Sequence, residues 1–213
     1  MIYLTLKKLP DNISAIQLYE KAVSVFAPSD ANAKYINKLS ERIGKSARES
    51  LFALILLAKL AERAGASPRE LVLRRNENGK PYFEDSKLKF SISHSGEYVA
   101  VALSDECDVG IDMETADIDG SKAIKMAKRF FTEKEQAEIE RDPSLFRDIW
   151  RKKEATAKCL GVTLERIIRD EKNATPRSAP NNEMRIQNIS IEGIAVTVCT
   201  GGDNSTAITV ADI

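Results

Sequence analysis

The chain has 213 residues, enough for one large domain or two small ones with cores of their own. Its 32 basic and 32 acidic residues cancel, so we expect no nucleic acid as partner, although a local basic cleft could hide in a neutral total. The first residues lack a signal-peptide pattern, and the longest apolar run (51–58) is far short of the ~20 residues of a membrane span. Three scattered cysteines without CxxC spacing disfavour a disulfide framework or a zinc site. We therefore expect a cytoplasmic protein with no membrane attachment.

In chain order, the pattern predicts a first strand at 2–6 and then a long helix between Gly44 and Gly65. Ser46 and Glu49 have the spacing of a capping box at the start of this helix, its interior is rich in Leu and Ala, and Gly65 can end it. A short helix is expected to follow at Pro68, and a turn at 76–79.

The middle of the chain predicts strands at 90–93 and 98–103 that form a hairpin around 94–97, followed by a strand at 109–114. Helices are expected from about Glu133 and from about Pro143 to Gly161, and then a polar link over 170–183. Closing strands are predicted at 184–191, 194–199 and 206–210. The mixture of elements indicates an α+β fold.

Two carboxylates, Asp112 and Glu114, share one face of the predicted strand, because side chains alternate along a strand. Their Cα atoms would lie about 6–7 Å apart, and a hard divalent cation would relieve the repulsion between them. A solvated acidic strand face is the alternative, and the pair alone favours that alternative.

A second candidate pair, Glu154 and Lys158, lies one helical turn apart on the helix that ends at Gly161, in line with Trp150. A carboxylate beside an amine could act as base and acid in one reaction. The alternative is an exposed Glu–Lys pair that contributes only about 0.3–0.5 kcal/mol to the helix, and the pair alone favours that alternative.

Three further positions could contact phosphate. Ser93 and His94 lie at the end of a strand, and His94 is the only histidine; without a GxSxG motif, a hydrolase triad is weakly supported. Lys80 lies between Gly79 and Pro81, in a segment that is not a P-loop. Glu135 has capping-box spacing with Thr132, so it needs no catalytic explanation.

Taken in order, the motifs Gly-Lys-Pro, Ser-Ile-Ser-His-Ser, Gly-Ile-Asp-x-Glu, Phe-Phe-Thr-x-x-Glu and Trp-x-x-Lys-Glu-Ala-x-x-Lys closely resemble the phosphopantetheinyl transferase superfamily. The match runs from about Gly79 to Gly161, with a looser fit at Arg48 and a poor one over 7–43. Length and the early Ser-His motif resemble the Sfp-type branch, which implies two pseudo-symmetric α+β halves in one chain, here 1–105 and 106–213, with the final strands completing the second half.

The resemblance also implies roles for individual residues. Asp112, Glu114 and Glu154 match the carboxylates that hold Mg²⁺, whereas Arg48, Lys80, Ser93, His94 and Lys158 match positions around the phosphates of coenzyme A. Glu154 and Lys158 match catalytic positions. Glu135 matches an acidic position of the active site, but its capping-box spacing leaves that role open.

By the same resemblance, the chain would move phosphopantetheine from coenzyme A to a serine of an apo acyl or peptidyl carrier protein. Two halves in one chain make a monomer sufficient. The cation-rich segment 120–129 is the expected docking surface for the carrier, with an ordinary solvated helix as the alternative. A magnesium-dependent nuclease and a non-catalytic coenzyme A-binding protein remain as alternative functions.

Overall fold

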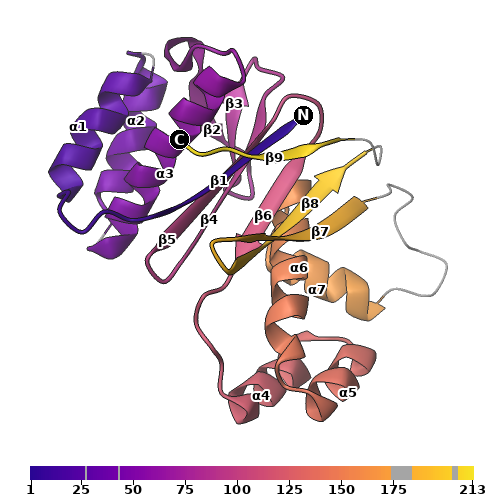
Figure 1. Ribbon diagram of the computed structural model, residues 1–213. Helices are drawn as coiled ribbons and strands as arrows, with labels where there is room; N and C mark the ends of the chain where they lie inside the picture. The colour runs from indigo at the N-terminus through magenta and orange to yellow at the C-terminus, as the bar shows by residue number, and fades with distance from the viewer. Residues whose placement is uncertain (27, 43, 174–183, 203–205) are drawn as a thin grey trace.

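The computed structural model describes residues 1–26, 28–42, 44–173, 184–202 and 206–213. Two β-sheets pack face to face, and helices cover the outer face of each (Figure 1). The predicted α+β class is confirmed. In the described part of the chain, no helix combines the length and the apolar character that crossing a membrane requires.

The first sheet has the strand order β4-β5-β1-β9. Its strands are β1 (Ile2–Lys8), β4 (Lys89–Ser95), β5 (Tyr98–Ser104) and β9 (Ile208–Val210). The expected hairpin is confirmed, but β4 extends through His94 and Ser95, which were expected in the turn. The last strand was expected to complete the second half; instead β9 pairs in parallel with β1 and so closes the first sheet.

Three helices and a small hairpin cover the first sheet. They are α1 (Ala15–Val25), α2 (Asp30–Ser40), α3 (Lys45–Arg63), the 3-10 turn η1 (Pro68–Glu70) and the paired strands β2 (Val72–Arg75) and β3 (Pro81–Glu84). Leucines of α3 pack against Val99, Val101 and Leu103 of β5. The capping box predicted for α3 is wrong: Gly44 is the N-cap, and no side chain of the described residues caps the helix. The Glu49 side chain forms ion pairs with His94 and Lys45 instead.

The second sheet has the order β6-β8-β7 and carries its helices on the far side. The elements are β6 (Val109–Met113), α4 (Gly120–Phe130), α5 (Glu133–Arg141), α6 (Leu145–Leu160), α7 (Leu164–Asn173), β7 (Met184–Ile191) and β8 (Ile194–Gly201). Gly161 ends α6 in the left-handed conformation, as expected. The polar link predicted at 170–183 is wrong for 170–173, which belong to α7, and its remaining residues lie outside the described ranges.

Between the sheets lies an apolar layer that joins Val109, Ile111 and Met113 of β6 to the inner face of β1 and β5. Along the neighbouring edge, β4 meets β6 through side chains instead of a backbone ladder. The hydroxyls of Ser91, Ser93 and Ser95 accept hydrogen bonds from the amides of Ile111, Met113 and Thr115 at 3.0, 3.3 and 3.0 Å. These three serines therefore bind the two halves of the molecule together.

Candidate active site

The candidate site begins where α6 crosses β6 at Gly110. A Cβ atom on Gly110 would lie 2.0 Å from the carbonyl oxygen of Ala155 and 2.3 Å from the amide nitrogen of Cys159. Only glycine lets the strand and the helix approach this closely. The alternation predicted for β6 is confirmed: Gly110 and Asp112 face α6, whereas Ile111 lies in the layer between the sheets.

Asp112 is buried at the centre of this contact. Its Oδ1 accepts hydrogen bonds from Ser93 at 2.9 Å and from the Lys158 ammonium at 2.7 Å. The other carboxylate oxygen, Oδ2, is buried and has no hydrogen-bond partner within the described ranges. A buried carboxylate oxygen without a partner is costly, and a bound cation or water would remove that cost.

Two further carboxylates lie next to Asp112. Glu114 follows β6 directly and accepts a hydrogen bond from Ser95 at 3.0 Å. Burial raises the pKa of Glu154; Lys158 opposes the increase, and the negative charges of Asp112 and Glu114 add to it. The three carboxylates predicted as a group therefore interact electrostatically.

These side chains fit a magnesium ion in chemistry, because carboxylate oxygens are the ligands that Mg²⁺ prefers. The partnerless Oδ2 of Asp112 also fits, since a cation there would complete its coordination. The positions of these side chains do not yet form a metal site. Among the residues that the structure describes, no three His, Cys, Asp or Glu side chains converge closely enough to hold a metal ion. Lys158 supplies the positive charge at Asp112 instead.

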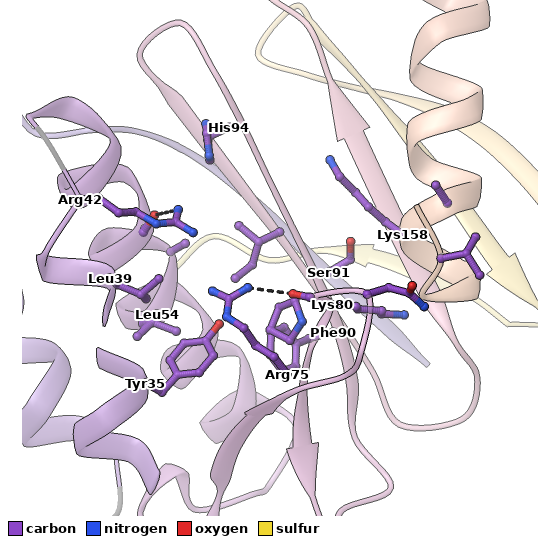
Figure 2. Close-up of a pocket in the computed structure, with 18 residues that line it drawn as sticks. Tyr35, Leu39, Arg42, Leu54, Arg75, Lys80, Phe90, Ser91, His94 and Lys158 are labelled. Atoms are coloured by element: carbon purple, nitrogen blue, oxygen red, sulfur yellow. Dashed lines mark hydrogen bonds between the residues drawn. The ribbon is translucent and has the colours of Figure 1, made fainter. Parts of the chain in front are cut away.

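A cavity of about 280 Å³ opens beside Lys158 and extends between the two halves (Figure 2). Its charged or protonatable lining consists of two arginines, two lysines and the single histidine, and none of the described residues that line it is a carboxylate: Arg42, Arg75, Lys80, His94 and Lys158. Tyr35, Leu39, Leu54 and Phe90 add aromatic and aliphatic surface. The lining therefore favours a ligand that is anionic and has an apolar or aromatic portion.

The far end of this cavity was not predicted from the sequence. Arg75 lies 4.8 Å from the centre of the Tyr35 ring and donates to the carbonyl oxygen of Gly79 at 2.8 Å. Arg42 donates to Ser50 at 2.8 Å. Tyr35 and Arg42 belong to a stretch without a recognisable motif, and Arg75 ends a strand directly before the predicted turn at 76–79, so no local pattern marked them.

Lys80 reaches from the first half to the last turn of α6. Its ammonium donates to the carbonyl oxygen of Cys159 at 3.0 Å, and burial lowers the pKa of Lys80. Asn76 and Asn78 both donate to the carbonyl oxygen of Gly161 at 3.0 Å. The Asn-x-Asn-Gly-Lys turn therefore caps the C-terminus of α6, a structural role that the sequence interpretation did not include.

The remaining residues predicted to contact phosphate lie in three different places. His94 lines the cavity, whereas Ser93 is buried at the contact with Asp112. Arg48 lies in a neighbouring hollow of about 590 Å³, which Arg42 also lines, and its guanidinium donates to the carbonyl oxygen of Pro10. The structure thus brings Lys80, His94 and Lys158 to one cavity and leaves Arg48 beside it.

Glu135 forms the capping box with Thr132 that the sequence predicted. It also forms an ion pair with the buried Lys153 at 2.7 Å. Burial alone would raise the pKa of Glu135, but the hydrogen bonds from Lys153 and Thr132 outweigh it and hold that pKa below its usual range. The capping box fixes the start of α5, and the ion pair links α5 to α6, so Glu135 has a clear structural role.

Two family models match the chain in succession. Residues 18–106 match the N-terminal 4'-phosphopantetheinyl transferase model, and residues 108–210 match the model described as the 4'-phosphopantetheinyl transferase superfamily. This chain belongs to the 4'-phosphopantetheinyl transferase superfamily. The first match ends at residue 106 and the second begins at residue 108, in the connection between β5 and β6. The two matches support the two-half architecture of this superfamily.

Curated members of the superfamily are similar to more than half of this chain. The 4'-phosphopantetheinyl transferase gsp of Aneurinibacillus migulanus is 39% identical over 124 residues, which cover 55% of this chain and 50% of that protein. The L-aminoadipate-semialdehyde dehydrogenase-phosphopantetheinyl transferase of Mus musculus is 32% identical over 146 residues, 58% of this chain and 47% of that protein. The 4'-phosphopantetheinyl transferase AcpT of Escherichia coli K12 is 29% identical over 130 residues, 58% and 63% respectively. Each match spans less than two thirds of the relative.

Proposed function

We propose that the chain transfers the 4'-phosphopantetheine group of coenzyme A to a serine of an apo carrier protein, with release of adenosine 3',5'-bisphosphate. Membership of the superfamily supports a transferase. The observation that carries the proposal is the position of Lys158, which lines the carboxylate-free cavity and contacts Asp112 of the acidic cluster. One side chain therefore joins a site suited to phosphates to a site suited to a cation.

In this proposal the cavity holds coenzyme A, and Lys158 faces its diphosphate. Asp112, Glu114 and Glu154 would hold Mg²⁺, which when bound neutralises negative charge on the phosphate oxygens. Lys80, Arg42, Arg75 and His94 would balance the other phosphate charges. The apolar lining around Phe90 and Leu54 suits the uncharged parts of the nucleotide.

The residues of α6 carry the proton steps. The raised pKa of Glu154 makes its carboxylate a better proton acceptor than an ordinary glutamate at the same pH. Glu154 accepts the proton of the carrier serine while the serine oxygen forms a bond to the β-phosphorus. The bond from that phosphorus to the oxygen bridging the α-phosphate breaks, and Lys158 stabilises the charge on the departing bisphosphate.

The carrier is expected to dock on α4, which lies at the outer end of α6 (Figure 1). Ala123 and Ala127 face the protein, whereas Lys122 and Lys125 are exposed and have no ion-pair partner among the described residues. Lys128 is also exposed but forms an ion pair with Glu140 at 2.9 Å. Lys122 and Lys125 are therefore the cations most available to an acidic partner.

The test is to incubate the protein with coenzyme A, Mg²⁺ and an apo carrier protein, and then to determine the mass of the carrier. A gain of one phosphopantetheine group, dependent on all three components, is the expected result. Coenzyme A binding without a mass gain would favour a non-catalytic binding protein instead. Cleavage of added DNA or RNA with no change in the carrier would favour a nuclease.

A further inference from the structure

Glu49 is a buried carboxylate in the second turn of α3, with only 7% of its surface exposed. It is not a helix cap, because the N-cap residue is Gly44 and no side chain bonds to the first turn. Burying a carboxylate is unfavourable unless it is paired. The position of Glu49 therefore needs an explanation from its tertiary contacts.

Two cationic or protonatable groups face Glu49. Its Oε2 lies 3.3 Å from Nδ1 of His94, and its Oε1 lies 3.6 Å from the Lys45 ammonium. Lys45 also donates a hydrogen bond to the carbonyl oxygen of Gly96, in the turn that follows β4. The start of α3 thus holds the end of β4 and its turn through two side chains.

His94 lines the cavity, at the rim of the group of arginines, and its side chain is 41% exposed (Figure 2). Nδ1 is the ring nitrogen that lies toward Glu49, at 3.3 Å, while Nε2 has no ion-pair or hydrogen-bond partner within the part of the chain that is described. Nε2 is therefore available to a ligand. A carboxylate on one ring nitrogen sets which tautomer the imidazole adopts.

We propose that Glu49 is a positioning residue that orients His94 for substrate binding. It accepts the Nδ1–H of the imidazole and so fixes the direction of the ring, and the doubly protonated ring then donates Nε2–H to a phosphate oxygen of the anion that enters the cavity. This inference rests on the proposed function, because coenzyme A is the anion we expect there. The other cavity cations, Arg42, Arg75 and Lys158, cannot accept this N–H, and Glu49 is the only carboxylate at ion-pair distance from Nδ1 among the described residues.

The first test observes the imidazole directly, without any substrate. His94 is the only histidine of the chain, so the ring-nitrogen NMR signals of ¹⁵N-labelled protein belong to it alone. In the wild type, the neutral ring is expected in the Nδ1–H tautomer; in Glu49→Leu, which removes the acceptor, it is expected to change to Nε2–H. Glu62→Leu, an exposed position on the same helix, is the control and should match the wild type. Identical signals in Glu49→Leu and the wild type would overturn the proposal.

The second test is a double-mutant cycle on the dissociation constant for coenzyme A, measured by calorimetry on folded proteins. Glu49→Gln preserves the shape of the side chain and should raise this constant about five- to tenfold, the scale of one weakened charge-assisted hydrogen bond. In a His94→Ala background the same substitution should have no further effect. Equal effects in both backgrounds would mean that Glu49 acts through the fold and not through His94.

The two tests separate the inference from the function on which it rests. If the wild type fails to bind coenzyme A, the proposed function and the ligand of His94 are both wrong. The NMR signals still decide whether Glu49 sets the ring, because they need no ligand. If coenzyme A binds but the cycle is additive, the proposed function stands and the role of Glu49 is rejected.

Discussion

Lys158 and Asp112 lie 46 residues apart in the sequence, and their side chains meet at 2.7 Å between α6 and β6. This contact leaves one oxygen of Asp112 satisfied and the other buried without a partner in the described structure. Oδ1 of Asp112 is thus held by its hydrogen bonds, whereas Oδ2 is left to bind the cation that we expect there.

Asp112→Asn tests the metal role. The amide oxygen can still accept from Ser93 and Lys158, so the fold should persist, but the loss of the charge should lower transfer by at least about 10²-fold. The measurements are carrier modification and thermal unfolding, with Asp170→Asn, an exposed position on α7, as control. Full activity of Asp112→Asn in chelator-treated buffer would contradict the assignment.

Glu154→Gln tests the proposed base. Turnover at saturating substrates should fall by at least about 10²-fold, the lower range for loss of a general base. If Glu154 and Lys158 formed only a surface pair, the substitution would change stability by less than about 1 kcal/mol and leave turnover unaltered. Glu62→Gln, an exposed carboxylate on α3 that does not act on Glu154, is the matched control.

Glu135 should make the stability of the protein depend on pH. Its pKa is lower in the folded state than in the unfolded state, so its contribution is fully present above the unfolded pKa of about 4.3 and is lost as the pH falls through the folded pKa. Glu135→Gln should therefore cost about 1–2 kcal/mol near neutral pH and less as the pH falls into the acidic range.

The measurement for Glu135 is chemical unfolding of both proteins over a series of pH values. Glu133→Gln, in the same first turn of α5 but exposed, controls for the helix dipole, which contributes about 0.3–1 kcal/mol. A stability difference between wild type and Glu135→Gln that stays constant over the whole acidic range would show that the carboxylate charge is irrelevant.

Gly110→Ala tests the close approach of α6 to β6. The added methyl group would overlap backbone atoms of Ala155 and Cys159, so α6 must shift. We expect a loss of about 1–3 kcal/mol in unfolding free energy, together with lower transfer, since Glu154 and Lys158 lie on the displaced helix. Gly201→Ala on β8 is the control, because its methyl group would meet only an ordinary contact of 3.8 Å. Equal effects of the two substitutions would contradict this account.

Lys122→Glu combined with Lys125→Glu tests docking on α4. The Michaelis constant for the carrier should rise steeply, whereas that for coenzyme A should hardly change, and added salt should weaken the wild type in the same direction. The control reverses two exposed lysines of the first half, Lys21 and Lys59. A rise in the carrier constant in the control alone would move the docking surface to that half.

The sequence predicted the elements around the motifs well, because strand alternation and helical spacing are local signals that survive in the fold. Gly110 and Asp112 share a strand face as expected, and α6 ends at Gly161 as expected. The helices α1 and α2 were not predicted, although Ser14 and Gln17 form a capping box at the start of α1 that the sequence displays. They lie in a stretch where no motif drew attention.

The contacts that the sequence did not predict are those between residues distant in the sequence. Glu49 has the spacing of a cap, yet His94, 45 residues away, provides its contact. Ser93 has the position of a phosphate contact, yet it is buried between Asp112 and the amide of Met113. Arg42 and Arg75 reach one cavity from different elements, and only the packing of α2, α3 and β2 brings them together.

The three serines of β4 also bear on how this protein avoids self-association. Both β4 and β6 are the outermost strands of their sheets, and an outermost strand with free amides can recruit the strand of another molecule. At this seam the amides of Ile111, Met113 and Thr115 already have hydroxyl acceptors from the same chain. Replacing the serines by alanine would therefore leave these amides without acceptors and loosen the joint between the two halves. The alternating serines thus use, within one chain, hydrogen-bonding groups that a strand of another molecule could otherwise pair with.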